Sequence, residues 1–303
     1  MIIKALGMSI MSGRYELLGR ADLKAASVPK SILSDKRDRG TALIISGNSR
    51  FHGAPVLSAL ASMRIGAGYV KLYVPKAIIN PVRSLSPNII VGALGSNSIT
   101  CNKEILGEVE RADAVAIGMG IGRLKDTISS ATKIIQVCAS SGVPVVVDAD
   151  AIISLRRLGR VGSAGMSIVA TPHDGEFFRL TGVKPDRSNI AKRASTASAW
   201  AGRLGIIIVL KGHYTIVTDG KRTRIGKPVS SALATMGTGD VLSGIICGYM
   251  ATGAGPFEAA CAGVYLHYRI GDILARRRGR HIIAVDVVDA IPSVIKEFDK
   301  SIH

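Results

Sequence analysis

Three kinds of segment alternate along the chain: a short apolar run, a polar loop that contains glycine, and a stretch with apolar residues at helical spacing. Strands are predicted at residues 41–46, 69–74, 114–117, 143–147, 166–170 and 206–210. Strands that alternate with helices are typical of an α/β protein with a mainly parallel sheet. No linker and no internal repeat interrupts this alternation. We therefore predict one domain over residues 1–303, with residues 1–20 as an N-terminal extension of no assigned role.

One glycine loop runs directly into an apolar helix. Gly237 and Gly239 allow positive φ and a close approach of the backbone to a ligand. The helix is expected to begin at or near Asp240, and its first amide groups can hold a phosphate or a developing oxyanion. Asp240 is then either a helix cap, which the spacing alone favours, or a general base beside the anion.

Polar residues also follow three of the predicted strands. Asp148 and Asp150 could coordinate hydrated Mg²⁺ or cap the next helix. His173 could contact a ligand or make a structural hydrogen bond. Lys211 and the following glycine could meet a phosphate or form a tight turn. Since parallel strands end at one edge of a sheet, these loops should converge, which favours the general-base interpretation of Asp240.

Charge and composition narrow the classes of partner. The chain has 39 Lys and Arg against 22 Asp and Glu, a formal charge of +17, but only 4% aromatic residues. Scattered basic residues with few aromatics argue against nucleic acid and are compatible with phosphorylated small molecules. No apolar run reaches the roughly 18–20 residues of a membrane span. Four widely spaced cysteines without metal-ligand spacing predict a cytoplasmic protein with free thiols.

Six motifs, in order, resemble those of the ADP-dependent NAD(P)H-hydrate dehydratases, a branch of the ribokinase-like superfamily. They are SGNSRFHGAP (46–55), IGMGIG (117–122), VVVDADA (145–151), TPHDGEF (171–177), VLKGHYTIVTDG (209–220) and MGTGDVLSG (236–244). The resemblance implies a ribokinase-like three-layer α/β fold. It also implies a repair lyase that dehydrates the (6S) hydrate of NADH or NADPH. ADP would be consumed, and AMP and phosphate released, through a phosphorylated intermediate.

The resemblance also implies roles for individual residues. Asp240 matches the catalytic base, and Gly237, Thr238 and Gly239 match the anion hole. Positions that contact the hydrated dinucleotide are matched by Ala54, Gly120, His173 and Asp240. Positions that bind the nucleotide are matched by Lys211, Gly212, His213, Tyr214, Thr215 and Gly239.

Further expectations follow from the family. Mg²⁺ would accompany the nucleotide, without an assigned ligand set but in the region of Asp148, Asp150 and Glu176, and the protein would be a homotetramer. Three departures bear on ligand geometry: Met236, Met119 and Ser230 stand where many relatives have glycine, proline and asparagine.

Two other functions stay open on the sequence. A kinase of the same fold, acting on a thiazole or pyrimidine alcohol or a sugar, would keep the anion hole and Asp240 but accumulate a phosphorylated product. A nucleic-acid-binding protein would show a steep salt dependence and no turnover.

Overall fold

The computed structural model describes residues 15–28, 35–95, 97–161, 167–227, 231–296 and 298. Ser230, Met166 and residues 1–14 of the predicted extension lie outside these ranges. The remainder of the extension joins the fold, because β1 (Glu16–Leu17) pairs in parallel with β10 (Thr223–Ile225).

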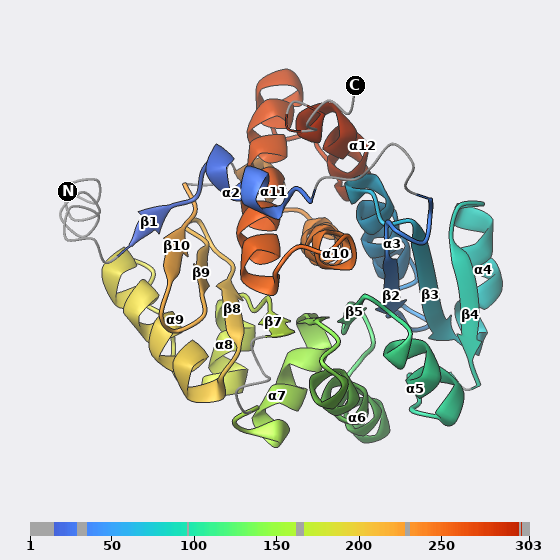
Figure 1. Cartoon of the computed structure of the whole chain (residues 1–303). Coiled ribbons are helices and arrows are strands. Elements are labelled where there is room, and N and C mark those ends of the chain that lie inside the picture. The colour runs from blue at the N-terminus through green and yellow to red at the C-terminus, as the bar shows by residue number, and fades with distance from the viewer. Residues whose placement is uncertain are drawn as a thin grey trace.

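A ten-stranded sheet forms the middle layer (Figure 1), in the order β1-β10-β9-β8-β7-β6-β5-β2-β3-β4. Its pairs are parallel except those that β9 makes with β8 and β10. The other strands are β2 (Thr41–Ile45), β3 (Tyr69–Pro75), β4 (Ile90–Leu94), β5 (Ala114–Ile117), β6 (Val145–Val147), β7 (Ile168–Ala170), β8 (Ile207–Leu210) and β9 (Ile216–Thr218). The predicted α/β class with a mainly parallel sheet is therefore confirmed.

Helices cover both faces of the sheet, and each face has its own apolar core. Alternate residues of the central strands enter opposite cores, as Ile44 and Ile45 do on β2. One layer contains α2 (Arg20–Ala26), α3 (Gly53–Ile65), α4 (Ile79–Leu85), α10 (Thr238–Ala251), α11 (Pro256–Arg278) and α12 (Ala284–Ile295). The other contains α5 (Lys103–Glu110), α6 (Lys125–Ser141), α7 (Ile152–Leu158), α8 (Asp174–Thr181) and α9 (Ile190–Leu204). Among the described helices, none combines the length and apolar character needed to cross a membrane.

The strand order reverses between β2 and β5. From β2 the chain continues outward through β3 and β4, and then returns to place β5 on the other side of β2. In open α/β sheets, ligands bind at the carboxyl ends of strands beside such a reversal. The loops after β2 and β5 therefore form one side of the candidate site.

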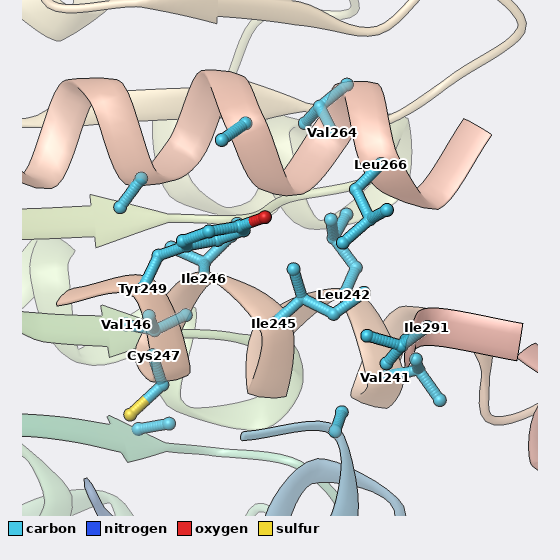
Figure 2. Close-up of a cluster of buried hydrophobic side chains, with 14 of the residues drawn as sticks. Val146, Val241, Leu242, Ile245, Ile246, Cys247, Tyr249, Val264, Leu266 and Ile291 are labelled. Carbon is cyan, nitrogen blue, oxygen red and sulfur yellow. The ribbon is translucent and has the colours of Figure 1, made fainter. Parts of the chain in front are cut away.

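Close packing of α3 against α10 places the start of α10 beside those loops. A Cβ on Gly244 would lie 2.2 Å from the Ser58 carbonyl oxygen. The hydroxyls of Ser58 and Ser62 donate to the carbonyls of Asp240 and Gly244, at 2.9 and 2.8 Å. Beyond this contact α10 is apolar on most sides, and Figure 2 shows Val241, Ile245 and Ile246 among the core side chains around it.

Two details differ from the sequence predictions. α10 begins at Thr238, two residues before Asp240, because Gly237 takes φ 89° and occupies the N-cap position. The strand β4 was not predicted, since Ile90 at its start is 52% exposed and Gly92 interrupts its apolar character. An edge strand with one covered side lacks the continuous apolar pattern of the buried strands.

Candidate active site

The turn into α10 leaves backbone amides free for an anion. A Cβ at Gly237 would lie 2.7 Å from Leu57 Cδ1 and 2.9 Å from Ala284 Cβ, so both φ and space require glycine. The first intrahelical bond runs from the Val241 amide to the Gly237 carbonyl, at 3.1 Å. The Thr238 hydroxyl donates backwards to Leu233 and Thr235 carbonyls, at 2.8 and 3.0 Å, and closes the turn. The arrangement suits an oxyanion or phosphate.

Asp240 stands at the third position of α10, and its carboxyl group does not cap that helix. Burial, followed by the neighbouring Asp148 carboxylate, raises the pKa of Asp240 to about 7; Glu176 adds to this and Lys211 opposes it. A carboxyl group that titrates near neutral pH can take a proton from a hydroxyl and is typical of catalytic sites. The cap interpretation therefore has no hydrogen bond to support it.

Lys211, partly buried, and Asp148, fully buried, form an ion pair beside Asp240. Lys211 Nζ lies 2.9 Å from Asp148 Oδ1, which also accepts the Thr171 hydroxyl at 2.7 Å, and Oδ2 accepts the Ser243 hydroxyl at 2.8 Å. Burial by itself would raise the pKa of Asp148, but Lys211 and these hydroxyls more than offset it and hold that pKa below its usual value. Burial likewise opposes the charge on Lys211, yet Asp148 and Glu176 keep its pKa raised. The site thus contains a fixed ammonium group.

His173 and Glu176 cap α8. His173 Nδ1 accepts the amides of Gly175 and Glu176, at 3.0 and 3.3 Å, and the His173 amide donates to Glu176 Oε2 at 2.9 Å. This reciprocal arrangement is a capping box in which histidine takes the usual place of serine or threonine. His173 Nε2 lies 3.3 Å from Glu176 Oε1, and because the side chain is still 55% exposed, part of the ring surface is open to a ligand. The structural interpretation of His173 is thus realised, and contact with a dinucleotide stays a prediction.

The predicted nucleotide segment, residues 211–215, follows β8 and is fixed through its backbone. The Lys211 amide donates to the Pro172 carbonyl at 2.8 Å, and Arg193 Nη2 donates to the Lys211 carbonyl at 2.8 Å. A Cβ on Gly212 would lie 2.8 Å from Arg193 Nη2. The other members are held as well: His213 and Tyr214 pack edge to face, and the Thr215 hydroxyl donates to the Gly212 carbonyl at 3.3 Å.

The loops after β2 and β5 contact each other at the opposite side. The Gly47 amide donates to the Met119 carbonyl at 2.9 Å, and a Cβ on Gly120 would lie 2.6 Å from Phe51 Cβ. Ala54 lies in the first turn of α3, one turn before Ser58, whose hydroxyl holds the Asp240 backbone. Met119 is fully buried, whereas Met236 is 87% exposed at the turn into α10.

The carboxylates proposed near a metal are engaged by the protein. Asp150 Oδ2 accepts the Gly122 amide at 3.0 Å and Oδ1 accepts Arg123 Nε at 2.7 Å. No group of three or more His, Cys, Asp or Glu side chains suited to hold a metal ion occurs within the described ranges. The expected magnesium ion in this region stays a prediction.

Several residues at the site were not predicted. Ser243 lies one turn after Asp240 on the same helix, and Thr171 begins the TPHDGEF motif, so spacing could have indicated both. Arg193, from α9, has no local signal. His267 on α11 lies near Thr238; burial lowers its pKa to about 4, an effect that the Thr238 backbone opposes, and its Nε2 has no hydrogen-bond partner.

The fold and the site define a ribokinase-like α/β protein. A ribokinase-like superfamily protein from Enterococcus faecalis matches with a TM-score of 0.83 at 24% identity, over 94% of this chain and 96% of that one. The sequence profile of the NAD(P)H-hydrate dehydratases matches residues 42–293. This chain belongs to the NAD(P)H-hydrate dehydratase family.

Individual relatives agree with that assignment. The ADP-dependent (S)-NAD(P)H-hydrate dehydratase of Cenarchaeum symbiosum is 34% identical over 94% of this chain and 98% of its own length. The bifunctional NAD(P)H-hydrate repair enzyme of Pyrobaculum aerophilum is 32% identical over 93% of this chain, which spans only 56% of that relative. An ADP/ATP-dependent NAD(P)H-hydrate dehydratase from Bacillus subtilis, co-crystallised with ATP and Mg²⁺, has a TM-score of 0.77 at 26% identity over 93% of this chain and 98% of its own. The predicted family resemblance is confirmed.

Proposed function

We propose that this chain is an ADP-dependent lyase that converts the (6S) hydrate of NADH or NADPH back to the reduced dinucleotide, with release of AMP and phosphate. The observation that supports it best is the placement of Asp240. A carboxyl group with a pKa raised to about 7 stands at the start of an anion-binding helix, beside the Lys211 ammonium. General base, anion hole and fixed cation are the groups that phosphoryl transfer to a hydroxyl needs.

In the first step, Asp240 takes the proton of the ring hydroxyl while the hydroxyl oxygen attacks the β-phosphorus of ADP. The bond between that phosphorus and the bridging oxygen breaks, and AMP leaves with the electron pair. The amides of Gly237, Thr238 and Gly239, together with Lys211, stabilise the charge on the transferring group. Residues 211–215 and Gly239 hold the nucleotide in this proposal.

In the second step, the phosphorylated ring loses phosphate. The ring nitrogen supplies electron density as the carbon–oxygen bond breaks. The adjacent carbon then gives up a proton to the released phosphate, which restores the double bond. Phosphate is a far better leaving group than hydroxide, so the protein mainly positions the ring. Ala54, Gly120 and His173 are the residues that we assign to this positioning.

Mg²⁺ is expected to enter with the nucleotide. Bound to the phosphates, the ion would neutralise their charge and polarise the transferring group. Asp148, Asp150 and Glu176 already accept protein hydrogen bonds, so we propose that they meet the ion's water ligands rather than the ion itself.

A single assay tests the function. Purified protein is incubated with hydrated NADH or NADPH, Mg²⁺, and ADP or ATP, while absorbance of the reduced nicotinamide and inorganic phosphate are followed together. We expect both to rise in equal amounts, faster with ADP than with ATP. Accumulation of a phosphorylated product without recovery of absorbance would indicate the kinase alternative instead, and equal or better rates with ATP would contradict the nucleotide preference.

We also propose a homo-oligomer, a tetramer by family resemblance, in the cytoplasm. Free thiols at all four cysteines support a reducing compartment. Exposed apolar side chains at Leu85 and Ile90, on and beside the edge strand β4, offer surface for self-association. Light scattering coupled to size-exclusion chromatography would report the mass, and a monomer at micromolar concentration would contradict the proposal.

A further inference from the structure

A cavity opens near the catalytic groups, between the loop after β5 and helices α6, α7 and α8. It measures about 290 Å³. The helices around it are neighbours in the fold, α7 lying between the other two (Figure 1). Its lining residues are Arg123, Lys125, Ile128, Ala149, Asp150, Ile152, Ile153, Arg157, Glu176 and Arg179. Asp150 and Glu176, at its edge, are the lining residues with a role proposed above, and the basic and apolar side chains have none.

The cavity has an excess of positive charge. Four basic side chains face two carboxylates, and both carboxylates are already engaged: Asp150 by Arg123 and the Gly122 amide, Glu176 by the His173 amide. Within the described ranges, no ion pair is formed by Lys125, Arg157 or Arg179. Three cations without a fixed partner around one hollow suit a ligand with a doubly charged phosphate group.

The remaining lining is apolar, as the contact surface of a base ring requires. Ile128, Ile152 and Ile153 line the cavity together with Ala149. Ala149 has φ 49°, the only positive φ of a non-glycine residue within the described ranges, and it directly follows Asp148. Unfavourable backbone of this kind tends to be retained at ligand sites. Apolar walls with a basic rim match the two parts of a phosphorylated adenosine.

The cavity adjoins the reaction centre through one shared residue, Glu176. Glu176 lines it, and Glu176 Oε2 lies 3.9 Å from Lys211 Nζ. Lys211 Nζ in turn lies 3.5 Å from the position that a Cβ would take at Gly239, in the anion hole. On the other side, Asp150 ties the cavity wall to the loop that carries Gly120. The cavity wall and the catalytic groups are therefore neighbours on both sides, within the span of one extended dinucleotide.

We propose that the cavity binds the adenosine end of the hydrated dinucleotide through its 2′-phosphate, so that the hydrate of NADPH is preferred over that of NADH. This inference rests on the proposed function. Arg157 and Arg179 are specificity-determining residues, because the 2′-phosphate is the only group that distinguishes the two substrates. The nucleotide co-substrate stays on the Lys211–Thr215 side.

The test compares both hydrates in wild type and in the double variant Arg157→Gln/Arg179→Gln, with Arg83→Gln/Arg203→Gln as a control that removes the same charge elsewhere. We expect kcat/KM for the NADPH hydrate to fall about 10- to 100-fold, the loss of charge-assisted contacts, and that for the NADH hydrate to fall by less than about three-fold. The control should leave the ratio between the substrates unchanged. Equal losses for both hydrates, or no loss, would overturn the inference; a raised KM for ADP alone would show that the cavity holds the nucleotide.

A binding measurement separates failure of this inference from failure of the proposed function. Calorimetric titration with adenosine 2′,5′-bisphosphate and with 5′-AMP needs no turnover. We expect the bisphosphate to bind wild type and to lose at least about ten-fold in affinity in the double variant, while 5′-AMP is affected much less. Identical affinities of the double variant and wild type for the bisphosphate would refute the site even if the enzyme repairs hydrates.

Discussion

At the scale of single residues, Asp240 combines two costs that a structural residue would avoid. Its carboxyl group is partly buried, and a neighbouring charge of the same sign, Asp148, is fixed by Lys211. A neutral amide of the same shape would remove both costs. The residue is therefore unfavourable for folding and useful only if it exchanges a proton.

The first prediction is that Asp240→Asn is nearly inactive and more stable than wild type above pH 7. A raised folded pKa means that the stabilising contribution of the protonated acid is present below the unfolded value of 3.8 and is lost as pH rises through about 7. Thermal unfolding at pH 8 should show a gain of about 1–4 kcal/mol, while turnover falls roughly 10²–10⁴-fold. If the variant turns over within a few-fold of wild type at saturating substrate, Asp240 is not the base.

The second prediction concerns pH. Since the base must be ionised, kcat/KM should rise with pH and level off above about 7. Glu176→Gln removes a negative charge that raises the pKa of Asp240, so the rising limb should move to lower pH; the amide oxygen can still accept the His173 amide. Rate profiles of this variant and of Glu110→Gln, an exposed change on α5, give the comparison. If the rising limb of the pH–rate profile does not move in Glu176→Gln, the charge of Glu176 does not raise the pKa of the base.

The third prediction separates two roles of His173. His173→Ala removes the cap of α8 and should cost about 0.5–2 kcal/mol of stability, whereas His173→Asn keeps an acceptor for the same amides. If the imidazole also contacts the substrate, both variants raise KM for the hydrate with little change in kcat, because uniform binding is lost. An unchanged KM in the asparagine variant would leave only the cap.

At the scale of elements, the contact between α3 and α10 decides where Asp240 lies. Gly244 and Gly248 allow the helices to approach until the hydroxyls of Ser58 and Ser62 reach carbonyls across the interface. Glycine is required at these positions because a Cβ would lie too close to α3, and not because of a positive φ. The position of the turn that carries Asp240 therefore depends on the packing of α3 against α10.

The fourth prediction tests that interface. Gly244→Ala places a Cβ 2.2 Å from backbone of α3 and should destabilise the protein by about 1–3 kcal/mol and lower kcat in the folded fraction. Gly107→Ala, also within a helix, meets only the guanidinium of Arg111 at 3.4 Å and should be neutral or stabilising by about 0.5–1 kcal/mol. Denaturant unfolding and activity per folded molecule measure both effects. Equal stability of the two variants would show that the helices can move apart.

At the scale of the whole molecule, the formal charge of +17 acts on ligands before they bind. Exposed charges are screened beyond about 8 Å at physiological ionic strength. The fifth prediction is that the association rate of ADP, followed by stopped-flow fluorescence, falls several-fold between low and high salt. Repeating the titration with uncharged adenosine is the control, and it should be insensitive. An ADP association rate that does not change with salt would show that the positive charge does not serve to attract ligands.

Much of the fold was readable because buried parallel strands are continuous apolar runs. The central strands and the helix after residue 237 fell within a few residues of their predicted positions, and the family was identified from six motifs. The predictions missed β4 and the helices around it, where one-sided exposure weakens the pattern. The single-domain assignment of residues 1–303 and the individual ligand contacts stay predictions.

The sequence by itself determined the class of sheet, the edge at which the loops gather, and Asp240 as the candidate base, since these depend on local pattern and on the direction of parallel strands. Only the tertiary structure decided the chemistry of that edge. Asp148 and Lys211 follow different strands and lie far apart in the chain. Asp240 and Ser243 come close to them from helix α10. The raised pKa of Asp240 arises from burial among these charges, and burial is a property of packing that no stretch of sequence contains.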